Sequence, residues 1–147
     1  MQVWIDGDGC PVTKLAWAIC RDAGIDCTIL CDTAHEFSFP GANILIVDKG
    51  ADSVDFAILR RLSPGDLVIT QDYGLAALCL SRGGIPIHQD GWVYTSENID
   101  ALLTQRQAAA KLRRGGIHCK GTGKRKASQD LAFSENFRKI LQNSTQG

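Results

Sequence analysis

The stretch VWIDGDGCP at residues 3–11 decides the fold. Its first three residues are apolar, and two acids and two glycines follow them. This pattern is typical of a buried strand that ends in a glycine-rich loop. Pro11 then suits the first turn of a helix. Apolar residues recur at helical spacing up to Ala23, and Gly24 is a natural C-terminal stop. The stretch therefore predicts the opening of a strand–helix–strand unit.

The pattern continues outward along the chain. Further strands are predicted at 27–31, 44–47, 67–70 and 85–87, with helices at 53–62 and 73–81. Pro86 makes the last strand an edge strand, because proline cannot donate to a ladder. Strands alternating with helices predict an α/β fold of three layers, α/β/α, around a mainly parallel central sheet.

The pattern changes after Gly91. We expect a long helix, capped by Ser96, that runs to Arg114. Residues 115–126 are rich in glycine and basic side chains, and Ser134 can cap a short last helix. This divides the chain into an α/β domain at 1–114 and a basic flexible arm at 115–147, whose short helix packs on the domain.

Composition fits a globular protein of 147 residues, with 44% hydrophobic and 22% charged residues. The sequence shows neither an apolar run long enough to span a membrane nor a secretory signal, so we expect a cytoplasmic protein without a membrane partner. The six cysteines read as reduced thiols, mostly in the core. The spacing of Cys27 and Cys31 would suit zinc, but no second close pair completes four ligands.

The net charge of zero conceals two opposite halves. Residues 1–100 hold 6 Lys and Arg against 14 Asp and Glu, whereas residues 101–147 hold 10 against 2. The basic part either grips phosphate next to an acidic site or neutralises its own body or a partner subunit.

Acidic residues follow three predicted strands. Asp6 and Asp8 come after the first strand, Asp48 after the third and Asp72 after the fourth, and Asp52 and Asp55 open the following helix. Because the carboxyl ends of parallel strands form the ligand crevice, these carboxylates should converge. Clustered carboxylates repel unless a cation lies between them, and Mg²⁺ or Mn²⁺ prefers oxygen ligands. The sequence therefore predicts a metal site suited to phosphodiester hydrolysis.

Each of these residues also has a structural explanation. Asp8, Asp52 and Asp72 could cap helices, and Asp48 could be a turn residue. Thr70 could contact phosphate or fill a strand end. Cys10 precedes a helix N-terminus, where the dipole lowers a thiol pKa, and His35 is the one histidine expected within reach as a base.

A family resemblance adds to this interpretation. Residues 6–12, DGDGCPV, resemble the D-A-D-A-C-P-V opening of the uncharacterised bacterial YaiI/YqxD family. Residues 50–55 look like its G-x-D-x-x-D element, and residues 64–76 like its P-G-D-L-V-I-T-x-D-x-x-L-A element. Residues 94–99 and the tail around Phe133 are similar as well. Glycines replace alanines at positions 7 and 9, and the basic arm stands where many relatives have a Gly/Pro-rich linker.

That family is regarded as PIN-like, so the resemblance implies a PIN-like fold with a Mg²⁺ or Mn²⁺ ribonuclease-type site. Carried over, the metal ligands are Asp6, Asp8, Asp52, Asp55 and Asp72. PIN-like folds often pair, which suggests a homodimer.

Three functions follow. The first is a metal-dependent nuclease acting on RNA or single-stranded nucleic acid, with Asp6, Asp55 and Asp72 as catalytic residues. Its basic side chains would bind backbone phosphates: Lys111, Arg113, Arg114, Lys120, Lys124, Arg125 and Lys126. The second is a non-catalytic nucleic-acid-binding or regulatory module. The third is a small-molecule phosphatase, although Cys10 stands where its aspartyl-nucleophile motif wants Thr or Val. Trp92 and Tyr94 could stack bases or simply pack a turn.

Overall fold

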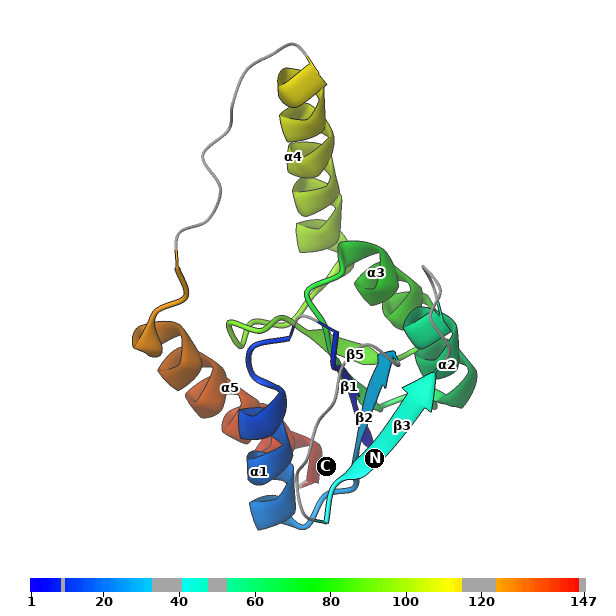
Figure 1. Ribbon diagram of the computed structural model, residues 1–147, viewed down its shortest axis with the longest axis vertical. Helices are drawn as coiled ribbons and strands as arrows, with labels where there is room; N and C mark the ends of the chain where they lie inside the picture. The colour runs from blue at the N-terminus through cyan, green and yellow to red at the C-terminus, as the bar shows by residue number, and fades with distance from the viewer. Residues whose placement is uncertain (9, 33–40, 48–52, 115–123, 146–147) are drawn as a thin grey trace.

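A computed structural model describes residues 1–8, 10–32, 41–47, 53–114 and 124–145 (Figure 1). Strands and helices alternate up to the fifth strand, close to the predicted bounds. The strands are β1 (Val3–Asp6), β2 (Cys27–Asp32), β3 (Asn43–Val47), β4 (Leu67–Ile69) and β5 (Ile85–Ile87). The helices are α1 (Thr13–Ala23), α2 (Ser53–Arg61), α3 (Tyr73–Ser81), α4 (Ser96–Arg114) and α5 (Ala127–Thr145).

The five strands form one sheet in the order β3-β2-β1-β4-β5, and every neighbouring pair is parallel. β5 lies at an edge, as Pro86 predicts. The chain first builds outward from β1 to β2 and β3, and then crosses to the other side of β1 to add β4 and β5. The topological switch point therefore lies between β1 and β4, where open α/β sheets bind ligands.

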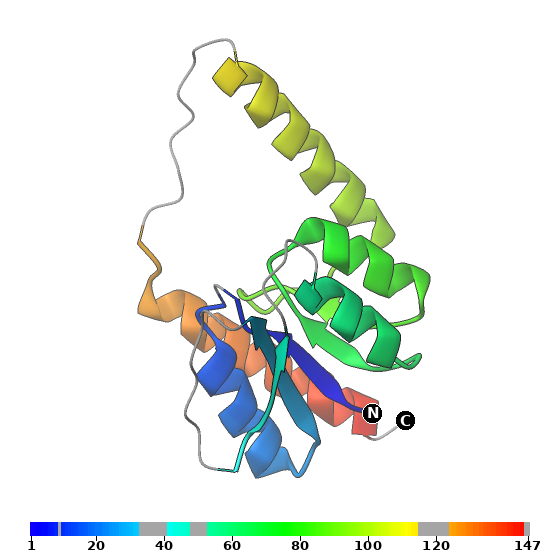
Figure 2. The same ribbon diagram turned by 45° about the vertical axis from the view of Figure 1, so that its right-hand side comes forward.

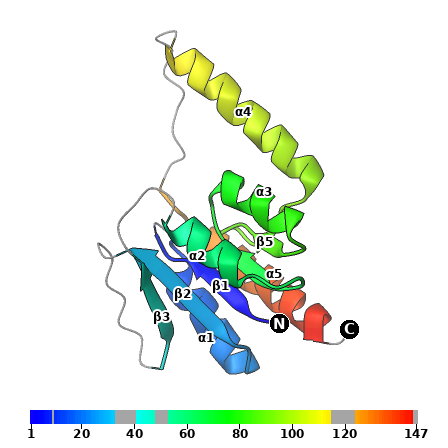
Figure 3. The ribbon, with the colours of Figure 1, turned by 90° about the vertical axis from the view of Figure 1, so that its right-hand side faces the viewer.

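Alternate residues of β1 define the two faces of the sheet. Val3 and Ile5 face a core shared with α1 and α5, and Trp4 faces a second core shared with α2 and α3. Figure 2 and Figure 3 show helices on both faces of the sheet. This is the predicted three-layer α/β/α fold.

The last helix is longer than predicted. α5 begins at Ala127, and Ser134 lies inside it with its hydroxyl donating to the carbonyl of Asp130 (3.0 Å). The start is capped instead by Gln129, whose side-chain oxygen accepts from the backbone N–H of Lys126 (2.7 Å). Phe133 and Phe137 of α5 are buried in the same core as α1.

α4 ends at Arg114 as predicted, but it begins at Ser96 itself, because Thr95 rather than Ser96 is the cap. The Asn98 side chain accepts from the Thr95 N–H (2.8 Å), and the Thr95 hydroxyl accepts from the Asn98 N–H (3.1 Å), as in a capping box. The first turns of α4 pack on α3 through Ile99 and Leu102. The end of α4 stands clear of the sheet and its covering helices (Figures 1 and 3).

The N-terminal edge of the sheet is tied together by Asp66. Its carboxylate accepts hydrogen bonds from the backbone N–H groups of Gln2 and Ser63 and from the indole of Trp4. These bonds outweigh the effect of burial and lower the pKa of Asp66. Asp66 therefore has a structural role, at the edge opposite the other predicted acids.

The cysteines within the described ranges are free thiols, and four of these five are buried. No helix in those ranges combines the length and apolar character needed to cross a membrane.

Candidate active site at the carboxyl edge of the sheet

Asp6 lies at the topological switch point, as the last residue of β1. Its side chain is buried, and the residue is 8% exposed. The Thr70 hydroxyl, at the end of β4, donates a 2.9 Å hydrogen bond to Asp6 Oδ2. A buried carboxylate thus stands between two strand ends, as the sequence predicts.

Burial raises the pKa of Asp6 to about 6. The Thr70 hydrogen bond opposes this rise, and the negative charges of Asp55, Asp8 and Asp72 add to it. These three carboxylates, drawn from separate parts of the chain, therefore lie near Asp6. The structure brings together four of the acids that the sequence singles out.

In three of these acids, one carboxylate oxygen accepts a hydrogen bond from another group of the protein. Asp72 caps α3, because its Oδ1 accepts from the N–H groups of Gly74 (2.9 Å) and Leu75 (3.2 Å). Asp8 does not cap α1, which has no side-chain cap. Its Oδ1 accepts instead from the N–H of Asp32 at the end of β2 (3.2 Å). Asp6 is bonded to Thr70 as described.

This donor set suits a divalent cation in its chemistry, because carboxylates supply oxygen ligands and their charges oppose the ionisation of the buried Asp6 carboxyl. Among the described residues, no three side chains of Asp, Glu, His or Cys are arranged to hold a metal ion as they stand. Asp48 and Asp52, also expected here, lie outside the described residues.

Thr70 is 1% exposed, and both functions of its hydroxyl are in use. The hydroxyl donates to Asp6 and accepts from the N–H of Asp72 (3.0 Å). The structure therefore assigns Thr70 to holding the two acids in place, and a phosphate contact would have to displace one of these bonds.

Cys10 is half-buried in the loop between β1 and α1, against the core beneath α1. Burial raises the pKa of its thiol, more than the hydrogen bond with Thr13 lowers it, and the charge of Asp6 raises it further. A neutral thiol is a poor nucleophile, so this site does not favour the cysteine chemistry that the position before a helix suggested. His35, the expected base, lies outside the described residues.

An aromatic cluster borders the acids. The sequence singled out two of its members, Trp92 and Tyr94, without indicating where they lie. The Tyr94 hydroxyl donates to the carbonyl of Thr70 (3.0 Å), so the buried Tyr94 ring lies directly beside the end of β4. Trp92 packs against Tyr94 and stacks on His88, and Tyr73 meets Tyr94 edge-on. Burial lowers the pKa of His88, which accepts the N–H of Asp90 at Nδ1 (3.1 Å). His88 is therefore a neutral packing partner in this cluster.

Arg125, one of the predicted phosphate-binding residues, lies in a hydrogen-bond network. Its guanidinium bonds to Asp90 (2.8 Å), to Asp130 (2.7 Å) and to the Gln89 carbonyl (2.8 Å). These bonds fasten the start of α5 to the turn after β5. Arg125 thereby anchors the basic region beside the carboxyl edge of the sheet.

The other predicted basic residues differ in position. Lys111, on α4, and Lys124 and Lys126, before α5, are exposed to solvent. Arg113 and Arg114 form the end of α4, and Lys120 lies outside the described residues.

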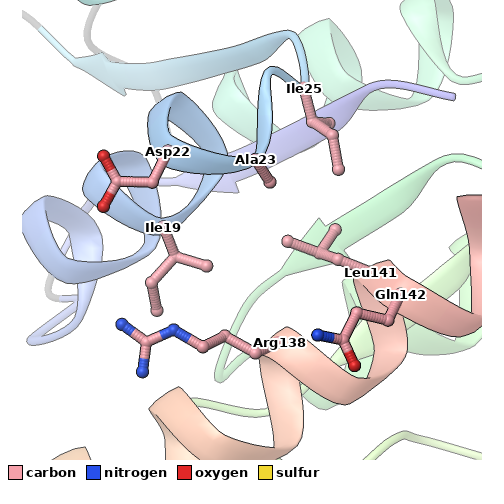
Figure 4. A pocket seen from close by; sticks show the side chains of 7 residues that line it. All are labelled: Ile19, Asp22, Ala23, Ile25, Arg138, Leu141 and Gln142. Carbon is pink, nitrogen blue, oxygen red and sulfur yellow. The ribbon is translucent and has the colours of Figure 1, made fainter.

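Two cavities within the described residues lie away from the acids. One of about 360 Å³ opens between the C-terminal halves of α1 and α5, at the end of the sheet opposite Asp6 (Figure 4). Its floor is apolar, with Ile19 and Leu141, and its rim carries Asp22 and Arg138. Another, of about 330 Å³, lies between α3 and the start of α4. Neither cavity contains a predicted site residue.

Comparison with known proteins identifies the family. The family model described as "Uncharacterized BCR, YaiI/YqxD family" matches residues 4–143. A UPF0178 protein from Exiguobacterium sibiricum is 47% identical over 145 residues, covering 99% of each chain. Another from Clostridium acetobutylicum is 40% identical, covering 96% of this chain and 97% of its own. No solved structure matches the chain significantly. The chain therefore belongs to the YaiI/YqxD family.

Proposed function

We propose that this protein is a metal-dependent nuclease that hydrolyses phosphodiester bonds of RNA or single-stranded nucleic acid at the Asp6 site. The observation that carries the proposal is the buried Asp6 carboxyl at the switch point, with a pKa raised to about 6 in the company of Asp8, Asp55 and Asp72. Such perturbed carboxyls gather at functional sites more often than elsewhere on a fold.

The side chains divide the work as follows. Asp6, Asp55 and Asp72 hold Mg²⁺ or Mn²⁺, assisted by Asp8. The ion, when bound, supplies positive charge next to the phosphoryl group. One of the carboxylates accepts the proton of the attacking water, whose oxygen bonds to phosphorus while the bond to the leaving ester oxygen breaks and that oxygen takes up a proton. Exposed lysines on α4 and before α5 bind backbone phosphates without reading sequence.

The test is cleavage of a labelled single-stranded RNA in Mn²⁺ by the wild-type protein, Asp6→Asn and Asp22→Asn. Asp22 is an exposed carboxylate on α1, at the other end of the sheet, and serves as the matched control. We expect Asp6→Asn to lower turnover at least about 100-fold and Asp22→Asn to leave it unchanged. Equal turnover in all three proteins would show that the Asp6 site takes no part in the reaction.

The binding-module alternative makes the opposite prediction. It is favoured by the lack of a ready-made three-ligand metal site within the described residues. In that case RNA binding weakens with salt, needs no metal and survives in Asp6→Asn. RNA binding that needs no metal and leads to no cleavage would therefore support the binding module and contradict the nuclease.

A further inference from the structure

Trp92 lies in a tight turn beside the acids and is not used by the carboxylate site. The turn is closed by hydrogen bonds from the His88 N–H to the Trp92 carbonyl and from the Gly91 N–H to the His88 carbonyl, both 2.9 Å. It follows β5, so it lies at the carboxyl edge of the sheet with Asp6 and Asp72. Tyr94 connects it to this edge through its hydrogen bond to Thr70.

Trp92 packs against the cluster of Ala76, Tyr94 and Ile99, and the aromatic rings in the described part of the chain meet one face and one edge of its indole. The His88 ring stacks on it with centroids 4.3 Å apart and an interplanar angle of 11°. The Tyr94 centroid is 4.6 Å from Trp92 and 6.0 Å from His88. These three distances nearly form a right-angled triangle, so His88 covers a face of the indole and Tyr94 lies at its edge. The indole is partly exposed, whereas Tyr94 is 1% exposed.

The acidic charge of this part of the protein favours a neutral contact with a nucleotide at the indole face. The first 100 residues carry a large excess of acidic side chains, which repels a phosphate backbone. A stacked nucleobase attaches a nucleotide through neutral surface, so its attraction does not depend on that field. The stacked His88 ring supports the indole on its first face.

We propose that the second face of Trp92 stacks an unpaired nucleobase next to the phosphodiester held at Asp6. This inference rests on the proposed function and narrows its substrate to nucleic acid with an unstacked, single-stranded base. A base within a duplex already has both faces stacked on its neighbours and cannot use the indole. Trp92 is then a substrate-binding residue that brings the strand to the acids.

The test compares three variants by anisotropy of a fluorescent single-stranded RNA in EDTA, where metal-dependent cleavage is off, and again in Ca²⁺. Trp92→Leu removes the ring, and Trp92→Phe keeps an aromatic face. Trp17→Leu is the matched control, because Trp17 is a partly exposed tryptophan on α1 with the Arg21 guanidinium 4.9 Å from its ring centroid. We expect Trp92→Leu to weaken binding about 5- to 150-fold, Trp92→Phe less, and Trp17→Leu not at all.

A second measurement changes the ligand instead of the protein. A series of RNAs, each with one abasic position, should weaken binding to the wild-type protein at one position, and this loss should disappear in Trp92→Leu. If Trp92→Leu fails to fold, the wild-type series alone decides. A flat abasic series, or equal affinities for Trp92→Leu and Trp17→Leu, would overturn the inference. Because binding is measured without cleavage, a stacked base in an inactive protein would refute only the nuclease.

Discussion

The Thr70 hydroxyl and Asp6 Oδ2 are 2.9 Å apart, and their hydrogen bond joins the ends of β4 and β1 across the topological switch point. The same hydroxyl accepts the N–H of Asp72, so one side chain fixes two of the acids. The bond opposes the rise that burial causes in the pKa of Asp6. Thr70 is therefore a positioning residue for the carboxylate site.

Replacing Thr70 with valine should raise the pKa of Asp6 above its value of about 6. Valine has nearly the same shape but cannot donate to the ionised carboxylate, which loses its stabilising partner. Thr70→Ser keeps the hydroxyl and should restore the wild-type value. Carboxyl carbon NMR titration of Asp6 in EDTA measures this shift, and an unchanged pKa in Thr70→Val would show that the hydroxyl does not stabilise the charged form.

Asp6 should make the folded protein less stable as the pH rises from about 4 to 6. Its folded pKa of about 6 lies above the reference value of 3.8, so the folded state binds more protons than the unfolded state in this window. The loss for this buried group is about 3 kcal/mol. Asp6→Asn cannot ionise and should exceed the wild-type free energy of unfolding by about that amount at pH 7, with the difference shrinking toward pH 4.

Denaturant unfolding across pH in EDTA measures this difference, with Asp66→Asn as a control of opposite sign. The pKa of Asp66 is lowered, so its charge stabilises the fold above pH 3.8 and that stability is lost as the pH falls further. Asp66→Asn should therefore destabilise the protein at pH 7. A pH-independent difference between Asp6→Asn and the wild-type protein would contradict the raised pKa.

Gly91 should tolerate alanine much less well than Gly24 does. A Cβ at Gly91 would lie 2.9 Å from both the Ala132 carbonyl oxygen and the Phe133 Cα of α5, and the residue has φ +96°. Gly24 also has a positive φ, +69°, but its Cβ would meet nothing within 4 Å. We expect Gly24→Ala to cost about 1–2 kcal/mol and Gly91→Ala about 2–4 kcal/mol. Equal costs in denaturant unfolding would show that the turn can move away from α5.

Substitutions of Arg125 and of its neighbour Lys126 should have different effects, the first on stability and the second on nucleic-acid binding. Arg125→Lys loses the fork that joins Asp90 and Asp130 and should cost about 2 kcal/mol of stability. Lys126 is exposed, so Lys126→Gln should leave stability unchanged and reduce the salt dependence of RNA binding by about 0.7 in the log–log slope. Thermal unfolding and salt titrations measure both effects. The reverse pattern would make Arg125 the phosphate contact.

The sequence predicts much of this molecule because its signals are local. Apolar runs bounded by glycine and proline locate the strands, and parallel strands bring their carboxyl ends to one edge, so Asp6 and Asp72 can be placed together before the fold is known. The sheet order could not be read, because it depends on which strands pair across the chain. The start of α5 was misplaced because Ser134 resembles a cap, while its hydroxyl bonds back within the helix.

Individual hydrogen bonds and ring contacts between distant residues could not be predicted from the sequence. Arg125 and Asp90 are 35 positions apart, so nothing local distinguishes this anchored arginine from its exposed neighbours. Trp92 and Tyr94 could be read either as base-stacking or as turn residues, since their relation to Thr70 appears only in three dimensions. Asp32 was overlooked because it contributes its backbone N–H to Asp8, which no side-chain pattern reveals.

The most direct test of the central claim is calorimetric titration of Mn²⁺ into the wild-type protein, Asp6→Asn and Asp22→Asn, with RNA cleavage measured on the same samples. The metal site predicts saturable binding and cleavage in the wild-type protein and in Asp22→Asn, with both lost together in Asp6→Asn. Absence of Mn²⁺ binding in the wild-type protein, or full binding and cleavage in Asp6→Asn, would contradict a metal-dependent nuclease at this edge of the sheet.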